Sequence, residues 1–149
     1  MKLKGTVEIP ADRATVFAFL TDPDKIGPCL PKVESVKKRP DGTFEATAKV
    51  GKGFLSATLV MHCSFTENVP PERAAIRATG KAKGSAVDGT ARMDLVELPD
   101  DAGTRVDWTA DVELSGIVAK LAGNRFDAKA NDLVDQTFRK VKKRIKAAG

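Results

Sequence analysis

Few residues in this chain have the types and spacing that catalysis or metal binding would need. The single histidine, His62, falls on the polar side of a predicted strand, and no nucleophile–base–acid set can be assembled around it. Cys29 and Cys63 lack the spacing of metal ligands, so we expect two buried, reduced thiols. The sequence therefore predicts no catalytic residue and no metal site.

Other polar motifs have structural explanations. Asp22 and Asp24 flank Pro23 and are typical of helix caps. The motif Gly51-Lys52-Gly53 is too short for a phosphate-binding loop, and no helix is predicted to follow it. We expect these residues to shape the fold rather than to react.

The strands predicted around these residues have an unusual apolar side. Polar and apolar residues alternate in segments 42–50, 54–65, 73–83, 88–97 and 104–114, as in an antiparallel sheet. Many apolar-side positions are small: Ala46, Ala48, Ala57, Ala74, Ala78, Gly80, Ala82, Gly89, Ala91 and Ala110. A curved sheet lined in this way cannot fill its own concavity. Either a long helix packs closely against it, or a helix and an apolar ligand share the space.

The remaining elements predict one α+β domain over residues 1–149. Segments 2–9 and 33–38 alternate as strands, and 11–20 has the pattern of a short helix, with a second short turn following through Ile26. After Gly116 an apolar stripe with helical spacing continues to Ile145. We expect a helix of roughly 25–30 residues, about 40 Å long, lying across a sheet of six to seven strands.

The net charge of +5 is concentrated near the C-terminal end of this helix. Six basic residues and no acid lie there: Arg139, Lys140, Lys142, Lys143, Arg144 and Lys146. Without them the chain has 19 basic residues (25 − 6) against 20 acidic ones. This cluster is either a solvated helix end or a contact for anionic lipid or an acidic partner. Nucleic acid is not expected, because no aromatic stacking set accompanies the charges.

Several strings, together with the order of elements, resemble the carbon monoxide dehydrogenase G-subunit family of the START-like superfamily, whose fold is the helix-grip. The similar strings are Val16–Pro23, Cys29–Glu34, Lys49–Gly51 with Phe54 and Leu55, Gly103–Trp108 and Gly116–Arg125. The resemblance covers nearly the whole chain. Lys32 departs from it, since glycine is usual there, and Phe17 stands where tryptophan is common.

The resemblance implies a non-catalytic accessory protein of a molybdenum-containing carbon monoxide dehydrogenase-type oxidoreductase. Such a protein would bind an isoprenoid quinone or lipid and link the enzyme to the membrane for electron transfer. No covalently bound cofactor is expected. The partners would be a hydrophobic small molecule, a molybdenum hydroxylase-type enzyme and an anionic membrane surface. With no signal peptide or membrane-spanning run in the sequence, we expect a cytoplasmic protein, peripheral at the inner face of the membrane.

On this basis we expect ten residues to line the ligand cavity: Phe17, Ile26, Leu30, Leu59, Met61, Met93, Trp108, Phe126, Val134 and Phe138. Ordinary core packing is the alternative for each of them. Two other functions stay open at this point. One is an enzyme like the polyketide cyclases and dehydratases, for which the predicted inward side offers only Cys63, Thr137 and Ser35 as polar groups. The other is a protein–protein adaptor with a filled core.

Overall fold

The computed structural model describes residues 1–52, 55–82, 84–116, 119–120 and 126–148, and the side chains of 50–57, 126–129 and 148 lie outside this description. The elements are β1 (Lys2–Ile9), α1 (Arg13–Leu20), α2 (Pro23–Ile26), the 3-10 turn η1 (Gly27–Cys29), β2 (Val33–Lys38), β3 (Phe44–Lys52), β4 (Leu55–Val69), β5 (Arg73–Ala82), β6 (Ser85–Glu97), the 3-10 turn η2 (Pro99–Asp101), β7 (Thr104–Gly116) and α4 (Phe126–Ala148).

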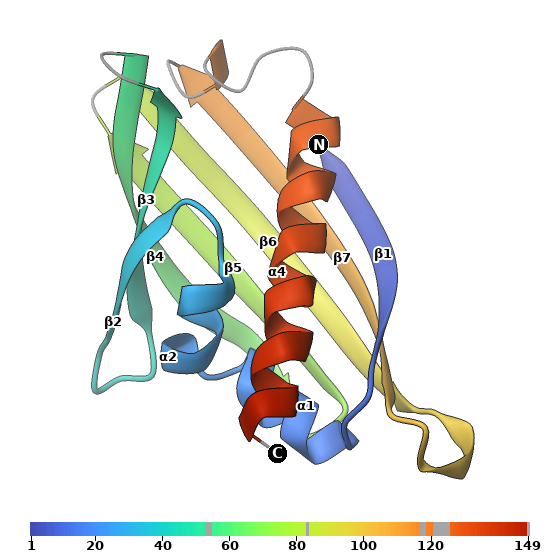
Figure 1. The fold of residues 1–149 in the computed structure, drawn as a ribbon. Coiled ribbons are helices and arrows are strands. Elements are labelled where there is room, and N and C mark those ends of the chain that lie inside the picture. The colour runs from blue at the N-terminus through green and yellow to red at the C-terminus, as the bar shows by residue number, and fades with distance from the viewer. Residues whose placement is uncertain (53–54, 83, 117–118, 121–125, 149) are drawn as a thin grey trace.

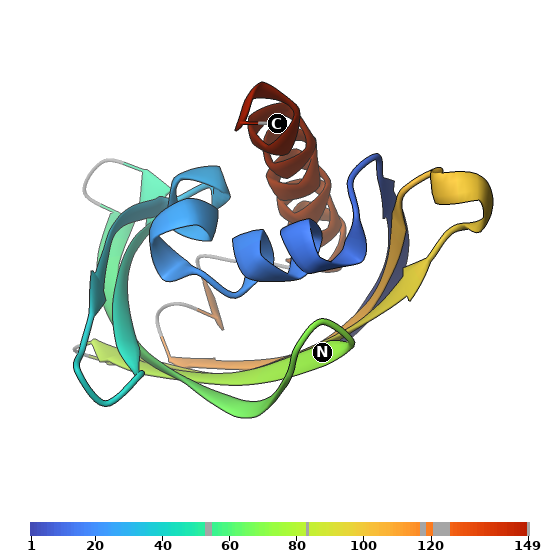
Figure 2. The same ribbon diagram turned by 90° about the horizontal axis from the view of Figure 1, so that it is seen from below.

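The strands form one antiparallel sheet that is strongly curved. Its order is β1-β7-β6-β5-β4-β3-β2, so β1 pairs with the last strand and the others follow chain order. Helix α4, with 23 residues, is the expected long helix, and the segment 121–125 before it lies outside the described residues. It lies across the concave face, and α1 and α2 cover one end of that face (Figures 1 and 2). The expected α+β helix-grip architecture is confirmed.

Strand β4 is longer than its sequence pattern predicts. The alternation ends at Phe65, but a β-bulge between Phe65 and Glu67 inserts one residue, and the ladder continues to Val69 opposite Arg73. A bulge shifts the side-chain alternation by one position without ending the pairing. The expected strand end at 65 is therefore wrong, because the pattern changed phase there rather than stopping.

The two short helices begin where aspartate caps them. Asp12 accepts a hydrogen bond from the Thr15 amide at 3.2 Å, and hydrogen bonds from Thr15 lower the pKa of this carboxyl. Asp22 caps α2 by accepting from the Asp24 amide at 3.0 Å, as predicted. Asp24 lies in the first turn of α2 and has another role, described below.

Most of the buried apolar residues that the structure describes fall into two separate clusters. The first joins α1, η1, α4 and one end of the sheet through the buried residues Ile9, Val16, Phe17, Phe19, Cys29, Ala74, Leu95, Val106, Val141 and Ile145. The second lies on β3 and β4 and contains Phe44, Ala46 and Cys63. Partly buried residues pack against each cluster. The space between the two clusters is where the site lies.

Lys32 has a φ of 71°, in the left-handed region that favours glycine. The departure noted in the sequence therefore falls on a residue whose backbone conformation suits glycine better than lysine. The Lys32 carbonyl accepts a hydrogen bond from the Lys49 amide at 2.9 Å, which ties this turn to β3.

We expect Lys32→Gly to raise the free energy of unfolding by about 0.5–1 kcal/mol, because relief of left-handed strain exceeds glycine's added chain entropy. Urea unfolding measures this. Lys37→Gly is the matched control, since Lys37 lies in β2 without a positive φ and its replacement should destabilise. A loss of stability in Lys32→Gly would contradict the prediction.

Candidate functional site

A cavity of about 420 Å³ lies between the sheet and α4, a volume typical of small-molecule sites. Its lining residues come from every described element of the domain except β1 and η2: Leu20, Thr21, Pro23, Ile26, Gly27, Leu30, Val33, Val36, Phe44, Ala46, Met61, Cys63, Phe65, Ala74, Ala75, Ile76, Ala78, Ala91, Arg92, Met93, Val106, Trp108, Thr109, Ala110, Val134, Thr137 and Phe138. Most of these side chains are apolar, so the wall suits an apolar molecule.

The cavity separates the two core clusters. Ile26, Met93 and Phe138 pack against the first cluster and also line the cavity. Met61 and Ile76 do the same beside the second cluster. A ligand in this space would contact both clusters and complete a core that the side chains leave open.

The cavity exists because its floor is made of small residues. Inward-facing alanines of β3, β5, β6 and β7 line it: Ala46, Ala74, Ala78, Ala91 and Ala110. Gly80 leaves room for the Met61 side chain, because a Cβ added at Gly80 would lie 3.0 Å from Met61 Cγ. Ala78 lies opposite Cys63 on β4 and Gly89 on β6, and Ala91 lies opposite Ala110 on β7, so small residues occupy two neighbouring rows in the middle of the sheet.

The structure brings most of the predicted lining residues together at this cavity. These are Ile26, Leu30, Met61, Met93, Trp108, Val134 and Phe138. Phe17 is 5% exposed within the first core cluster, and Leu59 is 3% exposed opposite Ala48; neither is among the described lining residues. Phe126 begins α4, and its side chain lies outside the described residues. The role of all ten in ligand binding stays a prediction.

Sequence reasoning missed the lining residues contributed by the short elements beside the sheet edge. Pro23 on α2 and Val33 and Val36 on β2 all line the cavity. The available signal was weak, because β2 carries a register irregularity between Val33 and Ser35 that disturbs its alternation. This bulge explains how Val33 and Val36, three positions apart, both reach the cavity.

The Trp108 ring packs directly against Gly5. Gly5 lies directly opposite it on β1, and a Cβ added to Gly5 would be 2.7 Å from Cζ2 of the indole. The ring therefore covers the glycine backbone and also forms part of the cavity wall. Gly5 is a second feature that sequence reasoning missed, although its place on the inward side of the first strand could have shown it.

The polar groups of the cavity are already bonded or neutral. The Thr21 hydroxyl donates to the Phe17 carbonyl, and the Thr137 hydroxyl donates to the Leu133 carbonyl, both at 2.8 Å. Burial raises the pKa of the Cys63 thiol to about 11. Arg92 alternates with inward Ala91, and its Nε lies 3.4 Å from Asp94 Oδ2. The described wall thus offers no group suited to acid–base catalysis near neutral pH.

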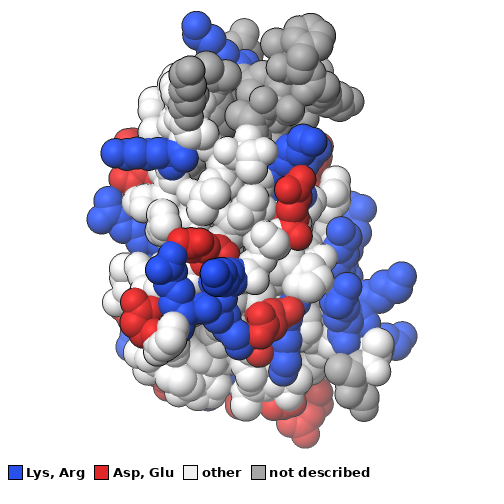
Figure 3. All heavy atoms as spheres, turned by 90° about the vertical axis from the view of Figure 1, so that its left-hand side faces the viewer, with Lys and Arg blue, Asp and Glu red and all other residues white. Residues whose placement is uncertain are grey.

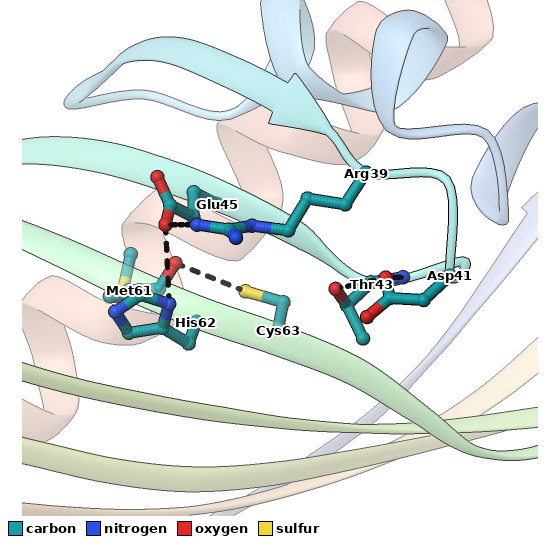
Figure 4. A network of polar contacts seen from close by, with 7 residues as sticks. All are labelled: Arg39, Asp41, Thr43, Glu45, Met61, His62 and Cys63. Carbon is teal, nitrogen blue, oxygen red and sulfur yellow. Dashed lines mark hydrogen bonds and ion pairs between the residues drawn. The ribbon is translucent and has the colours of Figure 1, made fainter.

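His62 lies on the exposed face of the sheet, as predicted (Figure 4). It is 64% exposed, and its Nδ1 is 3.4 Å from Oε1 of Glu45, which also binds the Arg39 guanidinium. Glu45 and His62 are direct cross-strand partners on β3 and β4. These contacts of Glu45 therefore link β3 to β4.

Within the described part of the chain, no group of acidic, histidine or cysteine side chains could hold a metal ion.

The basic cluster occupies the C-terminal half of α4. Five of its side chains are exposed, whereas Lys142 is half-buried. On the opposite side of the helix, Val141 and Ile145 are buried in the first core cluster with Cys29. Figure 3 shows basic side chains gathered on the lower right of one face, where α4 runs in that view. None of the described helices has the length and apolar character needed to cross a membrane.

We expect Gly5→Ala to displace the Trp108 ring and to destabilise the fold by about 1–3 kcal/mol through overpacking. Because Trp108 is the only tryptophan, its emission spectrum reports the displacement directly. Gly89→Ala is the control, since the nearest atom to its new Cβ would be 3.5 Å away. An unchanged spectrum and stability in Gly5→Ala would contradict this packing.

We expect the buried Cys63 thiol to make stability depend on alkaline pH. Its folded pKa of about 11 exceeds the ordinary value of 9.0, so the unfolded chain loses this proton first. The contribution of the neutral thiol is complete below pH 9 and is lost as the pH rises through 11. Urea unfolding should show the stability of the wild type falling faster than that of Cys63→Val over this range. Parallel curves would refute the assignment.

Solved structures share the fold at low sequence identity. A conserved protein from Geobacillus kaustophilus is 20% identical with a TM-score of 0.87, covering 99% of this chain and 97% of that one. A START superfamily protein from Mycobacterium smegmatis is 13% identical with a TM-score of 0.72, covering 99% of both chains. A protein from Thermus thermophilus is 18% identical with a TM-score of 0.71, covering 100% and 99%. These likenesses show the START-like helix-grip fold.

The comparison with protein families goes further than the fold. No protein with a curated description matches the chain. The sequence profile of CoxG, the carbon monoxide dehydrogenase G-subunit, matches residues 5–146, which include all of the described cavity lining. The chain therefore belongs to the CoxG family.

Proposed function

We propose that this protein carries an isoprenoid quinone, or a lipid of similar apolar character, and is not an enzyme. In this function it links a molybdenum-containing carbon monoxide dehydrogenase-type oxidoreductase to the cytoplasmic membrane. The observation that carries the proposal is the 420 Å³ cavity, whose described wall presents apolar side chains and no unpaired charge. Membership of the CoxG family supports the choice of partner enzyme.

The wall is suited to a flexible hydrocarbon. Each CH₂ group removed from water contributes about 0.8 kcal/mol, so a five-carbon isoprene unit can gain up to about 4 kcal/mol. Met61 and Met93 have adaptable side chains that can follow different tail conformations. Trp108 adds a flat aromatic surface on which a quinone ring can stack.

The basic cluster of α4 supplies a means of contact with the membrane. A basic residue near an anionic lipid surface contributes about 1 kcal/mol. Because Val141 and Ile145 anchor this helix in the core, the exposed charges keep a fixed orientation relative to the cavity. Binding of the cluster to lipid would therefore also orient the domain.

The chemistry of the wall argues against the cyclase or dehydratase alternative. Such catalysis needs a group that exchanges protons near neutral pH, and Cys63, with its pKa raised to about 11, is the only titratable side chain pointing into the described cavity. The two threonine hydroxyls already donate to helix carbonyls. A carrier needs neither a proton-exchanging side chain nor a free hydroxyl group.

The test of the proposal is solvent extraction of the purified protein followed by mass spectrometry. The expected result is about one quinone or other polyprenyl lipid per chain. Titration with menaquinone-4, followed by quenching of Trp108 emission, provides a second measurement. An empty extract together with no quenching would contradict the carrier function, and turnover of an aromatic polyketide would replace it with the enzyme.

We expect Ala91→Phe to block loading without unfolding the domain, because its ring would occupy the middle of the cavity. Menaquinone-4 affinity should fall at least about tenfold, the loss of roughly 1.4 kcal/mol. Thr90→Phe is the matched control, since Thr90 is adjacent but exposed on the other face of β6. Normal loading of Ala91→Phe would show that the ligand lies elsewhere.

Replacement of Lys140, Lys143 and Arg144 by glutamine should weaken binding to phosphatidylglycerol vesicles about a hundredfold, since each charge contributes about 1 kcal/mol. Vesicle co-sedimentation at low salt measures this effect. The same three-charge change at Lys2, Lys4 and Lys37 is the control for net charge. Equal losses in the two variants would mean that the cluster has no special role.

A further inference from the structure

One side of the cavity is a short segment that we call the lid, residues 22–31, which contains α2 and η1. Pro23, Ile26, Gly27 and Leu30 of the lid line the cavity. Three prolines restrict its backbone, so the segment is stiff. It lies between α4 and β2 (Figures 1 and 2). The lid therefore closes the space between α4, which covers the cavity, and the edge strand β2.

The lid is firmly anchored on the α4 side. Cys29 is fully buried in the first core cluster with Val141 and Ile145. At the start of the lid, Thr21 ends α1 with its amide and its hydroxyl both bonded to the Phe17 carbonyl. Opening the lid on this side would expose apolar side chains of the first core cluster to water, which is unfavourable in free energy.

The contact of the lid with β2 is different in kind. Lys38 Nζ lies 2.8 Å from Asp24 Oδ2 and 3.7 Å from Asp22 Oδ1. The Lys38 and Asp24 side chains are 51% and 61% exposed, respectively. These two carboxylates raise the pKa of Lys38, with the Asp24 hydrogen bond the largest cause. Exposed ion pairs of this kind are weak and are screened by salt.

Behind these ion pairs the packing is apolar and leads into the cavity. Gly27 approaches Val36 so closely that an added Cβ would lie 2.8 Å from Val36 Cγ2. Val36 and Val33 in turn line the cavity and are only partly buried. Strand β2 is at the edge of the sheet, so no further strand supports it among the described residues.

We propose that the apolar ligand enters and leaves between α2 and β2, and that the ion pairs of Lys38 with Asp22 and Asp24 hold this entrance closed. The inference rests on the proposed carrier function and adds the entry route of the ligand and the ion pairs that close it. Because these ion pairs are exposed, raising the salt concentration weakens them while leaving the apolar cavity intact. Ligand exchange should therefore be faster at high salt.

The experiment measures association and dissociation of decylubiquinone by stopped-flow quenching of Trp108. In Lys38→Met both rates should rise about three- to fivefold with the Kd unchanged, and their salt dependence should be lost. Lys37→Met is the matched control, since Lys37 lies next to Lys38 on β2 and forms no ion pair with a described residue. Lys38→Glu combined with Asp24→Lys reverses the main pair and should restore slow exchange.

Hydrogen exchange of the ligand-free protein gives a readout that does not depend on binding. The amides of residue 22 and residues 24–27 should exchange faster in Lys38→Met than in the wild type, while those of α1 stay unchanged. If the wild type binds neither decylubiquinone nor menaquinone-4 and its solvent extract is empty, the carrier proposal itself is overturned. If it binds but Lys38→Met changes neither the rates nor the exchange of the lid, the proposed entrance alone is overturned.

Discussion

The fold depends on one packing constraint, which is that a single strongly curved sheet must be covered from its concave side. Large side chains on every strand would fill the concavity and leave no cavity beneath α4. Alanines such as Ala78, Ala91 and Ala110 take the central positions instead, so α4 can lie over the sheet without filling the space below it. The buried core remains divided into two clusters, each stabilised by its own contacts.

This division separates stability from ligand binding. The first cluster joins Ile9, Val16 and Val141, all fully buried, and thereby fixes α1 and α4 to the sheet without any ligand. The cavity wall is left with partly buried side chains such as Met61 and Met93, which can adjust to what they contact. Charges are kept on the outer faces, where Arg39 and Glu45 or Arg92 and Asp94 pair. The site is thus apolar by construction.

The alternating pattern of the strands predicted the sheet and the inward direction of Met93, Trp108 and the alanines, because side-chain direction in a strand follows from period two. Periodicity says which way a residue points, but not whether a neighbour covers it. Phe17 and Leu59 point inward and are covered, so they pack in the core rather than along the cavity. The bulge after Phe65 and the seating of Trp108 on Gly5 depend on pairing between strands. No local pattern contains that information.

The most direct test of the cavity as a ligand site is NMR of protein labelled at its alanine methyl groups, with and without menaquinone-4. The cavity alanines, Ala46, Ala74, Ala78, Ala91 and Ala110, should shift on binding. The exposed Ala14 and Ala18 on α1 serve as internal references and should not move. Shifts confined to exposed alanines, with the cavity methyls unchanged, would contradict the account.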